Sequence, residues 1–229
     1  RTRGGICEIR GIQLSIAGFS DVHYRRLRRV YCYLSGALDQ VLTGELATSD
    51  REVARIQAWP DADLNGCHLT TKSTSGFFLN IVGSNGRIFP LGWGSKKQGA
   101  TAQHTAEAEL ISLASCLRSE LIPVQSLMQE ILQRPVEAEL LEDNAATIIA
   151  VNRGYSLAMR HVRRTQRTSL GLIHDMITEE PEEGQGRIRL IKARTADHLG
   201  DAFTKELDPR AFKDAMTAIG MRTMSEDTA

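Results

Sequence analysis

Four acidic residues lie at the ends of apolar segments or interrupt them, in the order strand, helix, strand, helix. Carboxylate oxygens are the ligands that hard divalent cations such as Mg²⁺ prefer. Two such ions about 3.5–4 Å apart can stabilise the attacking and leaving oxygens of a phosphodiester. No single segment can surround two ions, so different elements must each supply a carboxylate. The pattern predicts a metal centre whose ligands and catalytic groups are Asp61, Glu109, Asp143 and Asp201.

Each of these acids also has an ordinary structural explanation, because the chain contains 28 acidic residues and most must be solvated. Glu109 falls in the first turn of a predicted helix, where a negative charge is favourable in any case. Asp143 can form a turn with Asn144. Only the joint pattern favours a metal centre over these separate roles. Three nearby acids are alternative ligands, namely Asp63, Glu107 and Asp197.

Apolar periodicity and turn signals predict the elements that position the first three acids. A strand leads to Asp61, and a hairpin with its turn at 84–86 follows. A long helix begins at Thr105, and Pro123 should kink or split it. Alternation at 136–140 predicts a strand that ends at Asp143, and Asn144 can cap the helix after it.

The remaining pattern predicts further helices and one more strand. Helices are expected at 21–35, with an apolar stripe every three or four residues, and at 158–178. A last strand at 187–193 precedes a helix that carries Asp201 and begins at Thr195. Asp208 and Pro209 suit the start of a closing helix. The order of elements predicts an α/β fold with a mixed sheet and helices on its faces.

Composition is that of an ordinary globular protein of one or two domains, with 41% hydrophobic and 24% charged residues. Basic and acidic residues are equal in number, so net charge neither favours nor excludes a polyanionic partner. The four cysteines form no CxxC pair, which argues against a zinc site or disulfide framework and favours a reducing compartment. No apolar run reaches the roughly 20 residues of a membrane span. The opening residues resemble neither a start methionine nor a signal peptide, so a fragment of a longer chain is expected.

Two basic segments are candidate contacts for phosphates. Five basic residues occur among the eight at 160–167, and in a helix four of the arginines would share one face. Two lysines precede the helix that carries Glu109. A solvated charged face is the alternative for both segments. The candidate nucleic-acid-binding residues are Lys96, Lys97, Arg160, Arg163, Arg164 and Arg167. Trp59 and Trp93 are expected to be core aromatics.

Several short sequence motifs occur in the same order as in one known family. They are Asp-Ala-Asp at 61–63, Lys-Ser-Thr-Ser-Gly at 72–76, Gly-Trp-Gly-Ser-Lys-Lys-Gln at 92–98, Ala-Glu-Ala-Glu-Leu at 106–110, Asp-Asn-Ala-Ala at 143–146 and Asp-Ala-Phe-Thr-Lys-Glu-Leu at 201–207. From about 55 to 221 the chain resembles the ribonuclease H domain of copia-type retrotransposon polyproteins. Residues 24–39 resemble the segment that joins the polymerase to this domain.

The resemblance implies a ribonuclease H-like fold, with a five-stranded mixed sheet flanked by helices and preceded by a short helical connection segment. It implies residues 1–54 as a remnant of the reverse transcriptase and connection, 55–221 as the ribonuclease H domain and 222–229 as a flexible tail. The implied activity is cleavage of the RNA strand of an RNA–DNA hybrid with two Mg²⁺ ions, or Mn²⁺ in their place. The implied partners are the hybrid and the reverse transcriptase of the same polyprotein, with an intracellular location and neither a membrane nor a small-molecule cofactor.

The chain departs from the pattern of the family at Pro60, at Glu142 and at the pair Leu64-Asn65, which replaces a tryptophan-containing pair. Pro60 removes a backbone donor from a strand expected to be central, and Glu142 adds a negative charge beside Asp143. His198 is a candidate for the mobile histidine that assists catalysis in some ribonucleases H, or else a partly exposed helix residue. The alternative function is an inactive, connection-like domain that binds hybrid and supports a polymerase. A DNA-directed, integrase-like nuclease is a third reading.

Overall fold

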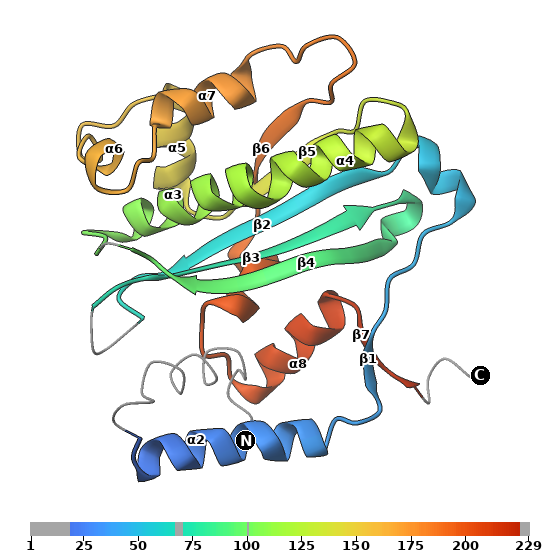
Figure 1. Cartoon of the computed structure of the whole chain (residues 1–229), viewed down its shortest axis with the longest axis vertical. Helices are drawn as coiled ribbons and strands as arrows, with labels where there is room; N and C mark the ends of the chain where they lie inside the picture. The colour runs from blue at the N-terminus through green and yellow to red at the C-terminus, as the bar shows by residue number, and fades with distance from the viewer. Residues whose placement is uncertain (1–18, 67–70, 100, 225–229) are drawn as a thin grey trace.

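The computed structural model describes residues 19–66, 71–99 and 101–224, and its centre is a five-stranded sheet. Neighbouring strands are antiparallel from β4 to β2, whereas β5 and β6 run parallel to β2 (Figure 1). The predicted α/β fold with a mixed sheet flanked by helices is therefore confirmed. Across the sheet the strands are β4 (Ile88–Lys97), β3 (Thr74–Val82), β2 (Arg55–Asp63), β5 (Ala138–Glu142) and β6 (Ile188–Lys192).

Two apolar layers cover the two faces of the sheet. Leu79 belongs to the larger cluster, beneath α3 (Thr105–Cys116), and Phe78 belongs to the smaller one, beside α8 (Pro209–Ala218). Successive strand residues point to opposite faces, so adjacent positions on β3 feed both layers. Figure 1 shows α3 and α8 on opposite sides of the sheet. The other helices on the side of α3 are α4 (Ile122–Leu132), α5 (Ala145–Arg153) and α7 (Leu170–Thr178).

Pro123 splits the long helix, as predicted, although the irregular turn lies before the proline. A π-helical turn at Leu117–Leu121 separates α3 from α4, and Pro123 occupies the first turn of α4. Proline has no N–H to donate to the carbonyl four residues earlier, so the i→i−4 ladder is interrupted there. The buried Leu117 and Leu121 keep both halves packed on the sheet.

The hairpin and two predicted helix starts are also confirmed. The turn falls at Ser84–Gly86, where Asn85 takes a left-handed conformation. The side chain of Asn144 accepts hydrogen bonds from two backbone amides at the start of α5. Asp208 does the same for α8, and Pro209 is the first residue of that helix.

Two predicted helices are wrong. The helix expected at 158–178 consists of the four-residue α6 (Val162–Thr165) and α7, separated by a loop in which Arg167 has a φ of 54°. The helix expected from Thr195 is instead two 3₁₀ turns, Thr195–Asp197 and Leu199–Phe203. Arg194, and not Thr195, occupies the N-cap position, and the chain leaves helical geometry at His198.

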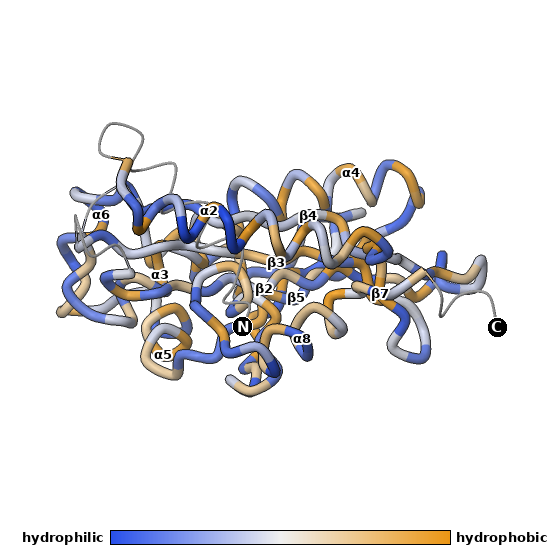
Figure 2. Tube along the Cα trace, turned by 90° about the horizontal axis from the view of Figure 1, so that it is seen from below, coloured by the Kyte–Doolittle hydropathy of each residue, from blue (hydrophilic) through white to orange (hydrophobic). Residues whose placement is uncertain are grey.

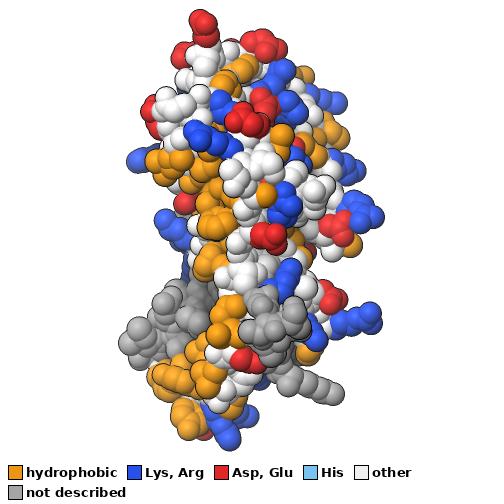
Figure 3. Space-filling view, turned by 90° about the vertical axis from the view of Figure 1, so that its right-hand side faces the viewer, with side chains coloured by type: hydrophobic (Ala, Val, Ile, Leu, Met, Phe, Trp, Pro, Cys, Tyr) orange, Lys and Arg blue, Asp and Glu red, His pale blue; other side chains and the backbone are white. Residues whose placement is uncertain are grey.

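The predicted helix at 21–35 is confirmed as α2 (Asp21–Ser35), in which hydrophobic and hydrophilic residues alternate (Figure 2). Tyr24, Tyr31 and Leu34, from its apolar stripe, are exposed. Figure 3 shows hydrophobic side chains as a discontinuous band along one face of the molecule, among charges of both signs. Among the described residues, no helix combines the length and apolar character needed to cross a lipid bilayer.

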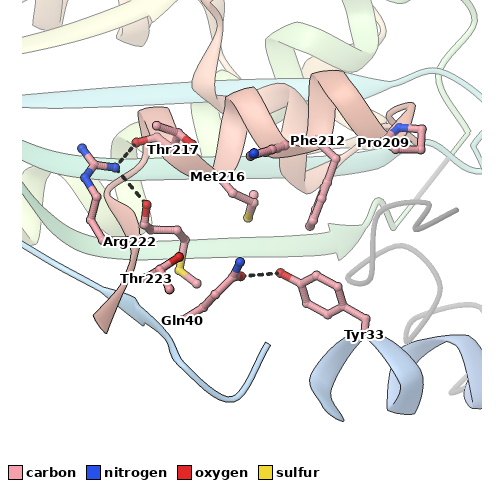
Figure 4. Close-up of a pocket in the computed structure, with 10 residues that line it drawn as sticks. Tyr33, Gln40, Pro209, Phe212, Met216, Thr217, Arg222 and Thr223 are labelled. Atoms are coloured by element: carbon pink, nitrogen blue, oxygen red, sulfur yellow. Dashed lines mark hydrogen bonds between the residues drawn. The ribbon is translucent and has the colours of Figure 1, made fainter. Parts of the chain in front are cut away.

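The N-terminal segment contacts the C-terminal segment at two places. The short strand β1 (Gln40–Leu42) pairs antiparallel with β7 (Met221–Thr223). Beside them lies a pocket of about 430 Å³, where the ring of Tyr33 meets the ring of Phe212 edge-on at 5.7 Å (Figure 4). None of the four predicted metal ligands lines this pocket. The first two residues of the tail predicted at 222–229 belong to β7, and residues 225–229 lie outside the described residues.

Candidate metal centre

The structure brings the four predicted acids together around Asp61. Ligand oxygens of Asp61, Glu109 and Asp143 all lie within 4.8 Å of one another. In a second group, ligand atoms of Asp61, Asp201 and His198 also lie within 4.8 Å of one another. Asp61 is buried and belongs to both groups, so one carboxylate connects two possible cation positions. The catalytic roles of these residues remain a prediction.

Neighbouring strands account for the approach of Asp61 and Asp143. β2 and β5 are parallel and adjacent, so both acids lie toward the carboxyl ends of their strands, at one edge of the sheet. The ladder between them stops at Ala58, so the missing N–H of Pro60 falls beyond it. Glu109 reaches the same edge from the first turns of α3. Ser112 Oγ ties that helix to the sheet by donating to the carbonyl of Asp61 at 2.7 Å.

A close backbone approach positions Asp201. The 3₁₀ turn that carries it lies against β2 at Gly200, where a β-carbon would be 2.5 Å from the carbonyl oxygen of Trp59. Any side chain at position 200 would push this turn away from the strand. Gly200 therefore determines the distance between Asp61 and Asp201.

The alternative acids make other contacts. Glu107 is fully buried and accepts hydrogen bonds from the backbone amide of Gln103, with the ring of His161 3.0 Å from its other oxygen. Asp197 is exposed and pairs with Arg194. Neither acid belongs to a ligand group in the described part of the chain.

The site holds excess negative charge in a buried position. Burial, and next the charge of Asp61, raise the pKa of Glu109 to about 10. Burial also raises the pKa of Glu142 to about 8, against the hydrogen bond that it accepts from the Asn144 amide. One oxygen of Glu109 and one of Glu142 have no hydrogen-bond partner. Buried carboxylates without partners are costly unless a cation or proton is close, so this donor set fits a divalent ion.

Two residues that sequence reasoning missed contact the acids directly. The ammonium nitrogen of Lys205 lies 3.1 Å from Asp61 Oδ1 and 2.6 Å from Asp201 Oδ1. The hydroxyl of Thr204 donates to the other oxygen of Asp61. Burial alone would lower the pKa of Lys205, but the two carboxylates raise it on balance. Burial and Asp61 raise the pKa of Asp201 to about 6. The i,i+4 spacing of Asp201 and Lys205 was the signal available in the sequence.

His198 differs from the partly exposed helix residue that was one prediction. Only 5% of it is exposed, and it lies between two 3₁₀ turns. Its Nε2 is 3.0 Å from the carbonyl oxygen of Leu141. Its Nδ1 is 3.9 Å from Asp201 Oδ1 and has no hydrogen-bond partner.

The predicted phosphate contacts lie in two separate segments, and the helical argument for one of them is wrong. Since residues 160–167 do not form one helix, their arginines share no helix face, although all four side chains are exposed: Arg160, Arg163, Arg164 and Arg167. Lys96 is exposed and Lys97 half-buried at the end of β4. Trp59 packs in the smaller core cluster, whereas Trp93 is half exposed, which corrects its prediction as a core residue.

Comparison with known proteins places the chain beside retrotransposon polyproteins. It is 28% identical over 204 residues to the "Retrovirus-related Pol polyprotein from transposon RE2" of Arabidopsis thaliana, and 25% identical over 204 residues to that from transposon RE1. Each match covers 88% of this chain and 13% of the relative, so the chain spans about an eighth of their length. These relatives confirm the predicted resemblance to a retrotransposon polyprotein.

No family model matches the chain. Among solved structures, the RNase H1 of the halophilic archaeon Halobacterium salinarum NRC-1 aligns with 70% of this chain and 98% of its own length. The identity of that alignment is 17% and its TM-score is 0.42.

Proposed function

We propose that this chain is the ribonuclease H part of a retrotransposon polyprotein and hydrolyses the RNA strand of RNA–DNA hybrids. The observation that carries the proposal is the gathering of Asp61, Glu109 and Asp143 within 4.8 Å, with Asp201 joined to them through Asp61. The relationship to retrotransposon polyproteins supports this function over other metal-dependent hydrolyses.

The four carboxylates would hold two Mg²⁺ ions, or Mn²⁺ in their place, which supply Lewis-acid stabilisation of the attacking water and of the leaving 3′ oxygen. Asp61 would contact both ions because it belongs to both ligand groups. Asp61 and Glu109 are buried, and their burial would limit the access of bulk water from one side of the site. Hydrolysis would leave 5′-phosphate and 3′-hydroxyl ends.

The exposed basic residues would bind the hybrid. We assign phosphate contact to the arginines of 160–167 and to Lys96 and Lys97, because a chain without net charge must attract a polyanion through local clusters of basic residues. Discrimination of RNA from DNA would rest on 2′-hydroxyl contacts and on the shape of the hybrid, with little reading of bases. The reverse transcriptase of the same polyprotein would supply the hybrid.

We further propose residues 55–221 as the catalytic domain, 1–54 as the remnant of the polymerase and connection, and 222–229 as a tail outside both. The core sheet and all four acids fall within 55–221. The pairing of β1 with β7 joins residues 40–42 of the remnant to Met221, the last residue of the proposed domain, and to the first two residues of the tail.

The direct test is cleavage of a labelled RNA–DNA hybrid by the whole chain, with Mg²⁺, with a chelator, and beside an Asp143→Asn variant. We expect metal-dependent cutting of the RNA strand alone, reduced at least about a hundredfold in the variant. Asp197→Asn, which removes an exposed acid outside both ligand groups, is the matched control and should cut normally. Unchanged cleavage by Asp143→Asn would refute the assignment.

A second candidate function is that of a domain that binds an RNA–DNA hybrid without cleaving it. Lys205 favours it, because an ammonium already lies between two of the acids. This candidate predicts hybrid binding with no cleavage by the folded protein at saturating Mg²⁺ or Mn²⁺. Cleavage of either strand under those conditions would exclude it, and cleavage of double-stranded DNA would favour the integrase-like alternative.

A further inference from the structure

His198 presents a buried ring nitrogen to two carboxylates. Its Nδ1 has no hydrogen-bond partner, although only 5% of the residue is exposed. The nitrogen lies 3.9 Å from Asp201 Oδ1, and a ring nitrogen of His198 lies within 4.8 Å of an Asp61 oxygen as well. A buried polar atom without a partner is costly, so its orientation toward the acids requires an explanation.

The neighbouring strand determines which nitrogen of the neutral ring carries the hydrogen. The carbonyl oxygen of Leu141 lies 3.0 Å from Nε2 and can only accept, so Nε2 carries the hydrogen. Nδ1 of the neutral ring is then left with a free lone pair. Histidines that bind metals show this arrangement, in which one nitrogen donates to a backbone carbonyl and the other faces the ion. The ring of Trp59 packs edge-on against the imidazole, 5.6 Å between centroids, and limits its rotation.

We propose that His198 is a metal ligand through Nδ1 and forms, with Asp61 and Asp201, a mixed nitrogen–oxygen site that prefers Mn²⁺ and other transition-metal ions to Mg²⁺. This inference rests on the proposed metal centre and adds a ligand to it. An imidazole ligand favours first-row transition ions, whereas an all-carboxylate site suits Mg²⁺. Ligands at about 2.0–2.2 Å from one ion lie roughly 3–4.4 Å apart, so the side chains need move little.

An ion pair between the ring and Asp201 explains the geometry less well. The distance of 3.9 Å is too long for a hydrogen bond, and Lys205 already supplies a positive charge to the same Asp201 oxygen at 2.6 Å. The ammonium of Lys205 and a metal ion would compete for this position. Since about a third of the Lys205 side chain is exposed, it can turn toward solvent when an ion binds.

The test is electron spin-echo spectroscopy of Mn²⁺ bound to the whole chain, together with calorimetric titration of Mn²⁺ and of Mg²⁺. When a histidine coordinates Mn²⁺, its ¹⁴N nucleus couples to the unpaired electrons of the ion, and the spectrum shows this coupling. We expect that coupling in the unmodified protein, and its loss in His198→Gln. The same variant should weaken Mn²⁺ binding at the Asp61–Asp201 position by at least about tenfold and Mg²⁺ binding by less than about threefold.

His174→Gln is the matched control, because this ring contacts a backbone carbonyl, of Val151, and belongs to neither ligand group. Far-UV circular dichroism checks that both variants fold. The spectrum of the unmodified protein requires no variant: bound Mn²⁺ without ¹⁴N coupling overturns the proposal for His198 and leaves the carboxylate centre in place. Binding of neither ion would instead overturn the metal centre of the proposed function.

Discussion

Lys205 holds its ammonium nitrogen 2.6 Å from Oδ1 of Asp201, four residues earlier in the chain. A second contact joins the same nitrogen to Asp61 at 3.1 Å, so a protein cation occupies the space between two predicted metal ligands. A divalent ion that binds these oxygens must displace it.

Substitution Lys205→Met should therefore tighten the weaker of the two Mn²⁺ binding steps by about tenfold, because the ion no longer competes with an ammonium. Without metal, the variant should be less stable by on the order of 1 kcal/mol, since two close carboxylates lose their counterion. Calorimetry and chelator-treated unfolding curves measure the two effects. Lys192→Met is the control, because this exposed lysine lies opposite Glu142 in the sheet and contributes the same charge. Equal tightening in both variants would show a general charge effect instead of displacement.

The buried Glu142 predicts an unusual dependence of stability on pH. Its pKa is raised by burial from 4.5 to about 8 in the folded protein. A raised carboxyl pKa contributes stability below pH 4.5 that is lost as pH rises toward 8, because the folded state must then bury a charge. The metal-free protein should lose on the order of 5 kcal/mol of unfolding free energy over this interval through Glu142, because one unit of pKa shift corresponds to about 1.4 kcal/mol. Urea unfolding at pH 5, 6.5 and 8 with chelator present measures the loss.

Glu142→Gln should flatten this pH profile, because the amide does not titrate. Glu109 keeps part of the slope, since burial raises its pKa as well. Glu183→Gln removes the same charge from an exposed loop and should leave the profile as it is. Identical slopes in Glu142→Gln and the unmodified protein would contradict the prediction.

Asp50 should anchor the segment before the five-stranded sheet. Its buried carboxylate accepts hydrogen bonds from the Ala47 amide, from the amide and hydroxyl of Ser84, and from the guanidinium of Arg87. Hydrogen bonds from Arg87, then Ser84, hold the pKa of Asp50 well below its usual range. This stability is present above about pH 3.8 and is lost as pH falls further. Asp50→Asn should lower the melting temperature at pH 7 by several degrees and make unfolding less sensitive to acid below pH 4.

Calorimetric scans between pH 3 and 7 test this prediction. Asp39→Asn, an exposed acid in the same N-terminal segment, should melt as the unmodified protein does. A melting temperature for Asp50→Asn equal to that of the control would exclude the anchoring role.

The arginines of 160–167 predict a salt effect. Arg163→Ala with Arg164→Ala should weaken hybrid binding and reduce the slope of log affinity against log salt by roughly one to two, because each phosphate contact releases counterions. Fluorescence anisotropy with a labelled hybrid measures both quantities from about 50 to 200 mM salt. Arg118→Ala removes an exposed charge from the π-helical turn and should change the slope little. An unchanged slope in the double variant would show that these arginines make no phosphate contact and form only a solvated charged face.

The strands of the sheet, and the elements that carry the first three acids, were predictable because they depend on the local pattern of residues. Alternating apolar residues specify strands such as β5, and turn residues such as Asn85 specify the hairpin. The gathering of Asp61 and Asp143 then follows from the parallel pairing of their strands. Pro123 predicted the split in the long helix, because a proline lacks the backbone N–H that a continuous helix needs, whatever its tertiary contacts.

Contacts between distant segments were not predictable in the same way. The helix expected at 158–178 fits the 3.6 period, but Arg167 adopts a positive φ that only the tertiary structure requires. The role of His198 depends on the carbonyl of Leu141, 57 residues earlier. No local pattern shows that contact, so one prediction for His198 was a partly exposed helix residue. Trp93 has the large aromatic side chain that is typical of a core residue, yet it is half exposed.

The pairing of β1 with β7 makes residues 40–42 and 221–223 a clasp between the two ends of the described chain. Thr43 extends this clasp, since its backbone and hydroxyl both donate to the carbonyl of Gly220. A protein trimmed to residues 55–221 would keep every predicted metal ligand but lose β1 and two of the three residues of β7, so the clasp could not form. The smallest piece of this chain that keeps the clasp should therefore begin before residue 40, well ahead of the first strand of the five-stranded sheet, and should extend at least to residue 223.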